Sequence, residues 1–301
     1  MKILIRHAAA LAAAAALLGC STPKQDAATF DPASLSRRYQ EGEVVVYRMK
    51  ASNQSRLRTI RYEAEAQGKV QKNAMGQYVE EFAWTNYVLN GAPVTLSPEA
   101  AAFRQRLSLE KGFPLTVPDL RPVLRLVGPI TDLLTFYVDL AVAKERGSLR
   151  RVGDHFHVAH GAPATWADGH YILKGEDSID FDVALEALDA DQQVATLVVR
   201  HVVPVQPQIS FVADWMRNPV ADTPNNWMQV SKQQDGRYIG AVGKELFDAR
   251  VRIDLRNGRI LGATLHNPVE IIERICTDAE LTHCDAPIRS QILRQIEIAS
   301  P

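Results

Sequence analysis

Residues 247–258 read FDARVRIDLRNG, and this stretch decides the fold class of the chain. Apolar and charged residues alternate along it: Phe247, Ala249, Val251, Ile253 and Leu255 are apolar, whereas Asp248, Arg250, Arg252 and Asp254 are charged. Such period-two alternation gives a strand one buried and one solvated face, which is typical of an antiparallel sheet. Asn257-Gly258 then joins the run to 259–266. Asn-Gly strongly indicates a hairpin because both residues tolerate a positive φ.

The same alternation recurs at 103–110, with Gln105 as an exception, and at 179–186. Turn residues such as Asn90-Gly91 and Asp235-Gly236 separate the other runs. Further strands are expected at 43–50, 57–67, 78–89, 155–160, 169–174, 194–203, 208–213, 226–232 and 291–298. Because strands follow strands without regular crossover helices, the sequence predicts a mainly β (α+β) fold of antiparallel, meander-like curved sheets.

One strongly apolar helix is expected at about 129–146. Pro129 suits its first position and Gly147 suits its end. One face carries four residues, Ile130, Leu134, Tyr137 and Ala141. Other apolar residues widen this face until little of the helix is polar. We therefore expect the concave face of the sheet to cover it, and these four residues to line a ligand cavity.

A second, short helix is expected near 268–276. Asn267 is a candidate N-cap and Pro268 fits the first turn. Glu270 adds a negative charge near the positive end of the helix dipole. The segment therefore predicts a short helix late in the chain.

The first 19 residues, MKILIRHAAALAAAAALLG, resemble a secretory signal peptide. Lys2 and Arg6 precede an apolar run that is shorter than the roughly 20 residues needed to span a membrane. Leu17-Leu18-Gly19-Cys20 resembles the lipobox of bacterial lipoproteins, so the resemblance covers residues 1–21. It implies cleavage after Gly19, a diacylglyceryl thioether on Cys20 and an amide-linked acyl chain such as palmitate.

A lipidated Cys20 implies a cell-envelope protein that faces the periplasm, because several acyl chains on one residue hold a protein stably at a membrane. Ser21 follows the cysteine where some lipoproteins carry aspartate. In lipoproteins like those of enterobacteria, this favours the outer membrane. Residues 20–41 read as a flexible tether. The β-rich globular domain follows at 42–301, either as one body or as two lobes that divide near 147–153.

Cys276 and Cys284 remain once Cys20 is lipidated. An even pair with a short spacing, in an oxidising periplasm, predicts one disulfide that closes a small loop. Two buried free thiols are the alternative. If the bond forms, its role is that of a local staple.

The histidines suggest a weaker hypothesis, because five of the eight fall close together in the sequence: His155, His157, His160, His170 and His201. On a strand, His155 and His157 project from the same face about 7 Å apart. The pair would hold a transition metal if His170, His201 or Asp154 converged on it. A solvated strand face is the alternative reading.

A basic run is a further candidate surface: Arg48, Lys50, Arg56, Arg58 and Arg61. Such residues can meet the anionic headgroups of a lipid surface. Glu63 and Glu65 follow at once, which argues against that interpretation.

Composition excludes several classes of protein. The 301 residues carry 34 Lys and Arg against 35 Asp and Glu, a net charge of -1, which gives no positive field for binding nucleic acid. Three cysteines are too few for a disulfide scaffold or a four-cysteine zinc module. Nucleophile-elbow, P-loop and dinucleotide glycine motifs are missing from the sequence. The chain therefore suggests no cofactor and is more typical of a binding protein than of an enzyme.

The leading hypothesis is a lipid-anchored envelope lipoprotein that binds an apolar ligand or another envelope component. Curved sheets over a helix resemble the half-barrel carriers of the LolA and LolB kind, which cradle acyl chains. This resemblance is one of architecture and rests on no shared motif. An envelope assembly or interaction subunit is one alternative. A metal-assisted hydrolase that uses the histidines of 155–201 is another.

Overall fold

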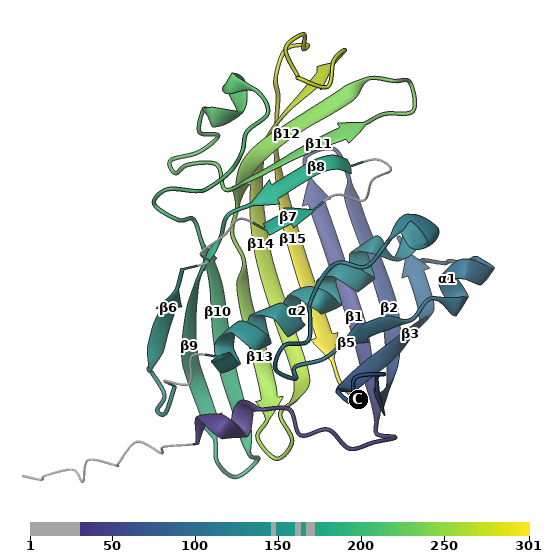
Figure 1. The fold of residues 1–301 in the computed structure, drawn as a ribbon, viewed down its shortest axis with the longest axis vertical. Helices are drawn as coiled ribbons and strands as arrows, with labels where there is room; N and C mark the ends of the chain where they lie inside the picture. The colour runs from purple at the N-terminus through teal and green to yellow at the C-terminus, as the bar shows by residue number, and fades with distance from the viewer. Residues whose placement is uncertain (1–30, 146–148, 160–163, 167–171) are drawn as a thin grey trace, which may run out of the picture.

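The computed structural model describes residues 31–145, 149–159, 164–166 and 172–301. Within them, 15 antiparallel strands form one sheet, and one long helix, α2 (Val127–Glu145), lies across a face of that sheet (Figure 1). The predicted mainly β fold with one long apolar helix is confirmed. The signal peptide, Cys20 and the tether up to residue 30 lie outside the described residues.

The strands follow the expected alternation closely. The first five are β1 (Val44–Ser55), β2 (Thr59–Lys72), β3 (Tyr78–Leu89), β4 (Ala92–Pro93) and β5 (Gln105–Leu107). The next five are β6 (His155–Val158), β7 (Ala164–Trp166), β8 (Ile172–Asp177), β9 (Asp180–Asp189) and β10 (Val194–Val202). The last five are β11 (Trp227–Lys232), β12 (Tyr238–Glu245), β13 (Asp248–Asp254), β14 (Arg259–Cys276) and β15 (Ile288–Ala299).

One short helix precedes the strands and three lie between them: η1 (Pro32–Leu35), then α1 (Pro98–Ala102), η2 (Arg121–Leu126) and η3 (Asp214–Arg217). Two of the strands predicted from the sequence differ from the structure. Residues 208–213 form no strand, and only Gln105–Leu107 of the run 103–110 pair with the sheet. Phe103 ends α1 instead of opening a strand.

The sheet forks at β14. One edge of β14 pairs with β15 over residues 262–273. Its other edge is shared, because 259–266 pair with β13 and 269–276 pair with β12. One branch continues through β10, β9 and β6, and the other through β11, β8 and β7, as Figure 1 shows. On the far side of the fork, β15 leads back through β1 and β2 to β3.

The short helix predicted near 268–276 is wrong, because these residues continue β14. The Asn267 side chain does not cap a helix; its amide donates a hydrogen bond to Glu245 Oε1 at 2.7 Å. Pro268, which has no N–H to give to a ladder, lies at the fork, between the last pair with β13 and the first with β12. The β-branched residues that follow favour a strand, and pairing on both edges outweighs the local cap signals.

The apolar side chains of α2 fill the space between the helix and the sheet. Four of them, Ile130, Leu133, Phe136 and Leu140, have no accessible surface, so no void as large as a water molecule adjoins them. Inner-face residues of β1, β2, β13 and β15 complete this core. By length and composition alone, the segment Arg121–Lys144 is apolar enough to cross a membrane; here most of it is buried against the sheet.

A second, smaller core lies where the branch of β12, β11 and β8 meets the loop that contains η3. Met216 of η3 packs there with Met228, Val242 and Leu281. The Cys276–Cys284 pair adjoins the same cluster. Both cores sit on one continuous sheet, and the expected domain boundary near 147–153 stays a prediction.

The outermost strands of the forked sheet are all short. β4 and β5 flank β3 with 2 and 3 residues, β6 ends one branch with 4, and β7 ends the other with 3. Short outer strands leave few unpaired backbone groups for another strand to join.

Candidate functional site

A hollow of about 380 Å³ lies at the fork of the sheet. It is lined by the end of β10, by the connection from β12 to β13, and by β14 at His266 and Pro268. Because these segments belong to both branches, the fork itself creates the hollow. Its position could not be read from any single sequence motif.

Basic side chains dominate the polar lining of this fork hollow. Arg200, Lys244 and His266 line it together with one carboxylate, Asp248. Asp248 lies between two arginines, with Oδ2 3.7 Å from Arg200 Nε and Oδ1 3.5 Å from Arg250 Nη1. Lys244 Nζ lies 2.7 Å from Asp222 Oδ1 and lowers the pKa of that exposed carboxyl. Both cations of the hollow, Arg200 and Lys244, are therefore already paired with a carboxylate.

Two buried polar atoms of residues that line the fork hollow have no hydrogen-bond partner within the described part of the chain. They are His201 Nδ1 and Thr223 Oγ1. Buried polar atoms are nearly always paired with protein, water or a ligand, and leaving one unpaired is costly. Both atoms have almost no accessible surface, so a ligand in the hollow would pair with them only after neighbouring side chains shift.

His201 also reaches into the core. Its Nε2 lies 2.8 Å from Asp139 Oδ1 on α2, and the rings of Phe181 and Phe247 meet its imidazole edge-on at 4.7 and 4.4 Å. The carboxylate fixes the orientation of the ring, because an imidazole N–H that donates to it cannot rotate away without loss. The lining of the fork hollow at this point is therefore rigid.

Two further buried polar contacts hold α2 to other strands. The Tyr137 hydroxyl donates to Glu80 on β3, and Glu80 Oε1 lies 2.9 Å from Arg37 Nη2. Asp132 accepts from Tyr62 on β2 and pairs with Arg294 on β15. Burial raises the pKa of Glu80 in spite of the guanidinium. An all-round apolar helix has no preferred face, so these polar contacts fix its rotation on the sheet.

A second hollow of about 490 Å³ crosses five neighbouring strands, from β2 to β13. Polar residues that are partners across these strands line it: Arg61, Ser52, Gln295, His266 and Asp248. His266 and Asp248 line the fork hollow as well, so the two hollows meet at that pair. We call the two hollows together the outer groove.

No family model, curated protein or solved structure matches the chain. Its function therefore has to be argued from the residues of the groove and from the sequence.

The predicted ligand-cavity residues of α2 lie in the core. Ile130, Leu134 and Tyr137 are buried and Ala141 is partly buried. None of the four lines the fork hollow or the outer groove. The structure therefore brings them together without leaving a cavity beside Ile130.

The histidines are dispersed. His157 Nδ1 lies 2.8 Å from Asp182 and its Nε2 lies 3.2 Å from Asp180, so the two carboxylates face opposite sides of the ring and cannot converge with it on one ion. Asp182 raises the pKa of His157. His155 is exposed on the same strand. In the described part of the chain no group of three metal-ligating side chains is present, and His160 and His170 lie outside it.

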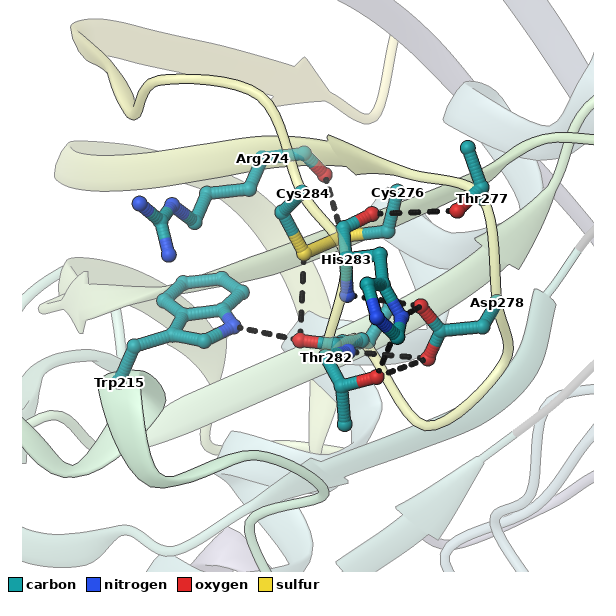
Figure 2. Close-up of a disulfide and its surroundings, with 9 residues drawn as sticks. Trp215, Arg274, Cys276, Thr277, Asp278, Thr282, His283 and Cys284 are labelled. Atoms are coloured by element: carbon teal, nitrogen blue, oxygen red, sulfur yellow. Dashed lines mark hydrogen bonds and ion pairs between the residues drawn. A yellow bond between two sulfur atoms is a disulfide. The ribbon is translucent and has the colours of Figure 1, made fainter.

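Cys276 and Cys284 form a disulfide at the end of β14, as Figure 2 shows. In the closed loop, Asp278 accepts the backbone N–H groups of Thr282 and His283, which lower its pKa to about 2. Trp215 Nε1 donates to the carbonyl of Leu281 at 3.3 Å. The bond therefore fixes a loop on which the η3 segment rests.

Sequence reasoning missed the residues of the fork hollow. Lys244, Thr223 and Asp248 carry no motif, and they meet Arg200 only because β14 joins two branches. The available signal was indirect. His201 belongs to the cluster of histidines that the sequence analysis singled out.

Proposed function

We propose that the protein is a lipid-anchored lipoprotein of the bacterial cell envelope, at the outer membrane and facing the periplasm, that acts by binding another envelope component. The signal-like and lipobox-like pattern of residues 1–21 supports the anchor at Cys20. The Cys276–Cys284 disulfide is in keeping with an oxidising compartment.

The observation that carries the binding role is the fork hollow, with Arg200, Lys244 and His266 in its lining. Pockets of 300–1,000 Å³ with a few convergent polar groups are typical ligand sites. An apolar ligand under α2 is not favoured, because side chains fill that space around Ile130 and Phe136. The proposal therefore places the binding surface in the outer groove.

The chemistry of the groove suits a component that carries hydrogen-bonding groups. Lys244, Arg200 and His266 supply donors, while Thr223 supplies a hydroxyl. Apolar wall from Phe247 and Pro268 gives the uncharged part of such a component a surface to pack on. The proposed activity is recognition without bond making or breaking.

Photo-crosslinking in intact cells tests the binding role. A benzophenone amino acid at position 266 should capture an envelope component, and Lys244→Ala together with Thr223→Val should abolish that capture. The same label at Gln192, which is exposed in the β9–β10 turn, is the matched control. Equal capture at both positions, or capture that survives the paired substitution, would contradict the proposal.

Mass spectrometry of the membrane-purified protein tests the anchor separately. The expected N-terminus is a triacylated Cys20. A mature chain that lacks Cys20, or one that carries it unmodified, would refute the anchor and leave the groove untouched.

A further inference from the structure

The hairpin between β1 and β2 ends in a rigid turn with an outward-pointing leucine. Leu57 is 94% exposed, and Arg56 and Arg58 beside it are exposed too. Ser55 holds the turn closed: its N–H and its hydroxyl both donate to the Arg58 carbonyl, at 2.9 and 3.0 Å. Its hydroxyl oxygen accepts the N–H of Arg58 in return. The tip is therefore a fixed feature of the surface.

The acidic residues that follow the basic run do not neutralise this tip. Glu65 lies 3.6 Å from Arg48, and Glu63 is the cross-strand partner of Lys50, so both lie along the hairpin and away from its end. Over the described residues, Arg56, Arg58 and Arg61 form no ion pair. The fold thus places Arg48 and Lys50 beside acidic residues along the hairpin. It leaves Arg56 and Arg58 at the end of the hairpin without an ion pair to any described residue.

A second apolar residue lies at the same end of the sheet. The last pair between β1 and β15 joins Ser55 to Ile292, and both Leu57 and Ile288 lie beyond it. Ile288 is 52% exposed and is followed by the exposed Arg289. In Figure 1 this end of β1 is the upper one, whereas η1, near the start of the described chain, lies at the lower end.

Single exposed leucines are common and need no explanation. The combination here is more specific: two exposed apolar side chains stand at one end of the sheet among four exposed arginines. Guanidinium groups bind phosphate oxygens in a bidentate manner. An apolar side chain between them can enter the boundary between headgroups and acyl chains. The chemistry matches an anionic phospholipid surface.

We propose that the tip formed by Arg56, Leu57, Arg58 and the start of β15 docks onto an anionic phospholipid bilayer. The docking is a contact additional to any N-terminal lipid, at the opposite end of the sheet from η1. It does not rest on the binding role of the outer groove. It also does not require Cys20 to be acylated.

The test uses residues 21–301, which contain every described element of the fold and carry no acyl chain. Co-sedimentation is measured with vesicles of phosphatidylethanolamine and phosphatidylglycerol, and with vesicles of phosphatidylcholine alone. The chain should bind the anionic vesicles only, and more weakly as salt is raised. Arg56→Ser with Arg58→Ser should weaken binding by roughly 25-fold, at roughly fivefold per arginine. Leu57→Ser should weaken it as well.

Two controls match these variants. Met75→Ser changes a side chain that is 75% exposed in the β2–β3 turn, at the other end of the same strand. Arg150→Ser with Arg151→Ser removes two exposed, adjacent arginines elsewhere. Both should bind like the parent. The proposal is overturned if the parent ignores anionic vesicles, if the tip variants bind like the parent, or if the arginine control loses as much as the tip variant.

Discussion

Asp139 of α2 and His201 of β10 face each other inside the core, with Oδ1 2.8 Å from Nε2. Asp139 has no accessible surface, and the remaining nitrogen of His201 is one of the unpartnered atoms of the fork-hollow residues. One imidazole thus connects the core helix to the candidate site. A change that loosens α2 should therefore also change the lining of the fork hollow.

Replacing His201 by Phe should destabilise the fold strongly, because it leaves Asp139 buried without its partner. Breaking a buried pair in this way costs about 3–5 kcal/mol. The double variant Asp139→Leu with His201→Phe should lose less than the single variant does, since no buried charge remains. Urea unfolding of the parent, both single variants and the double variant gives the coupling free energy between Asp139 and His201. Additive losses would show that the two residues do not act as a pair.

Glu245 should make the stability of the protein fall as pH rises. Burial raises the pKa of Glu245, and Asp177 adds to this, while the amide of Asn267 and nearby His201 oppose it. The protonated form is thus favoured in the folded state. Its contribution is fully present below the unfolded pKa, near 4.5, and is lost as pH climbs through the folded pKa.

Glu245→Gln removes this titration while keeping the shape of the side chain. The free energy of unfolding of the variant relative to the parent should therefore increase between pH 4 and pH 7.5. Urea titrations at the two pH values give the comparison. A gap that stays constant, or that shrinks as pH rises, would contradict the assignment.

Gly258 should be the least replaceable glycine of the turns. Its φ is +70°, and an added Cβ would lie 2.3 Å from the carbonyl oxygen of Ser36. Gly236 has a φ of +87° with open space around it, so it isolates the backbone effect. Gly236→Ala should cost about 1–2 kcal/mol, and Gly258→Ala clearly more.

The additional destabilisation in Gly258→Ala should loosen residues 31–38, the first described segment of the chain. The N–H of Arg38 donates to the Asn257 carbonyl, so displacing Ser36 should release residues 31–38 first. Limited proteolysis followed by mass spectrometry measures this release. Equal cleavage of the two alanine variants would mean that the contact with Ser36 contributes nothing.

Removing the disulfide should lower the free energy of unfolding by a modest amount, because the loop that it closes is short. With a separation of 8 residues, the loop-entropy relation gives about 2.5 kcal/mol for Cys276→Ala with Cys284→Ala. Because Trp215 donates to Leu281 inside that loop, its fluorescence should shift before global unfolding. Met75→Ser serves as an exposed control. Unchanged unfolding and unchanged fluorescence would show that the bond does not organise this region.

The sequence could predict the strands because alternation is local. Ala249, Val251 and Ile253 are fully buried while Arg250 and Arg252 are exposed, as the period-two pattern requires. The helix at 129–146 followed from its own composition in the same way. Such predictions need no knowledge of distant residues.

The predictions that failed, or were not made, concern residues whose structure depends on distant parts of the chain. Pro268 resembled a helix start because the residues next to it in the sequence give no sign of the strands that pair with both edges of β14. Asp139 is a charged residue within the apolar helix, and its partner His201 follows 62 residues later. The fork hollow depends on four strands at once. These features therefore depend on pairing between distant residues, which local sequence patterns do not reveal.

The short outer strands have a consequence for encounters between copies. A neighbour that tried to extend the sheet at β4, β5, β6 or β7 would find at most 4 residues to match. Ladders that short do not persist in water. Pairing of one copy with another through these four outer strands is therefore not expected.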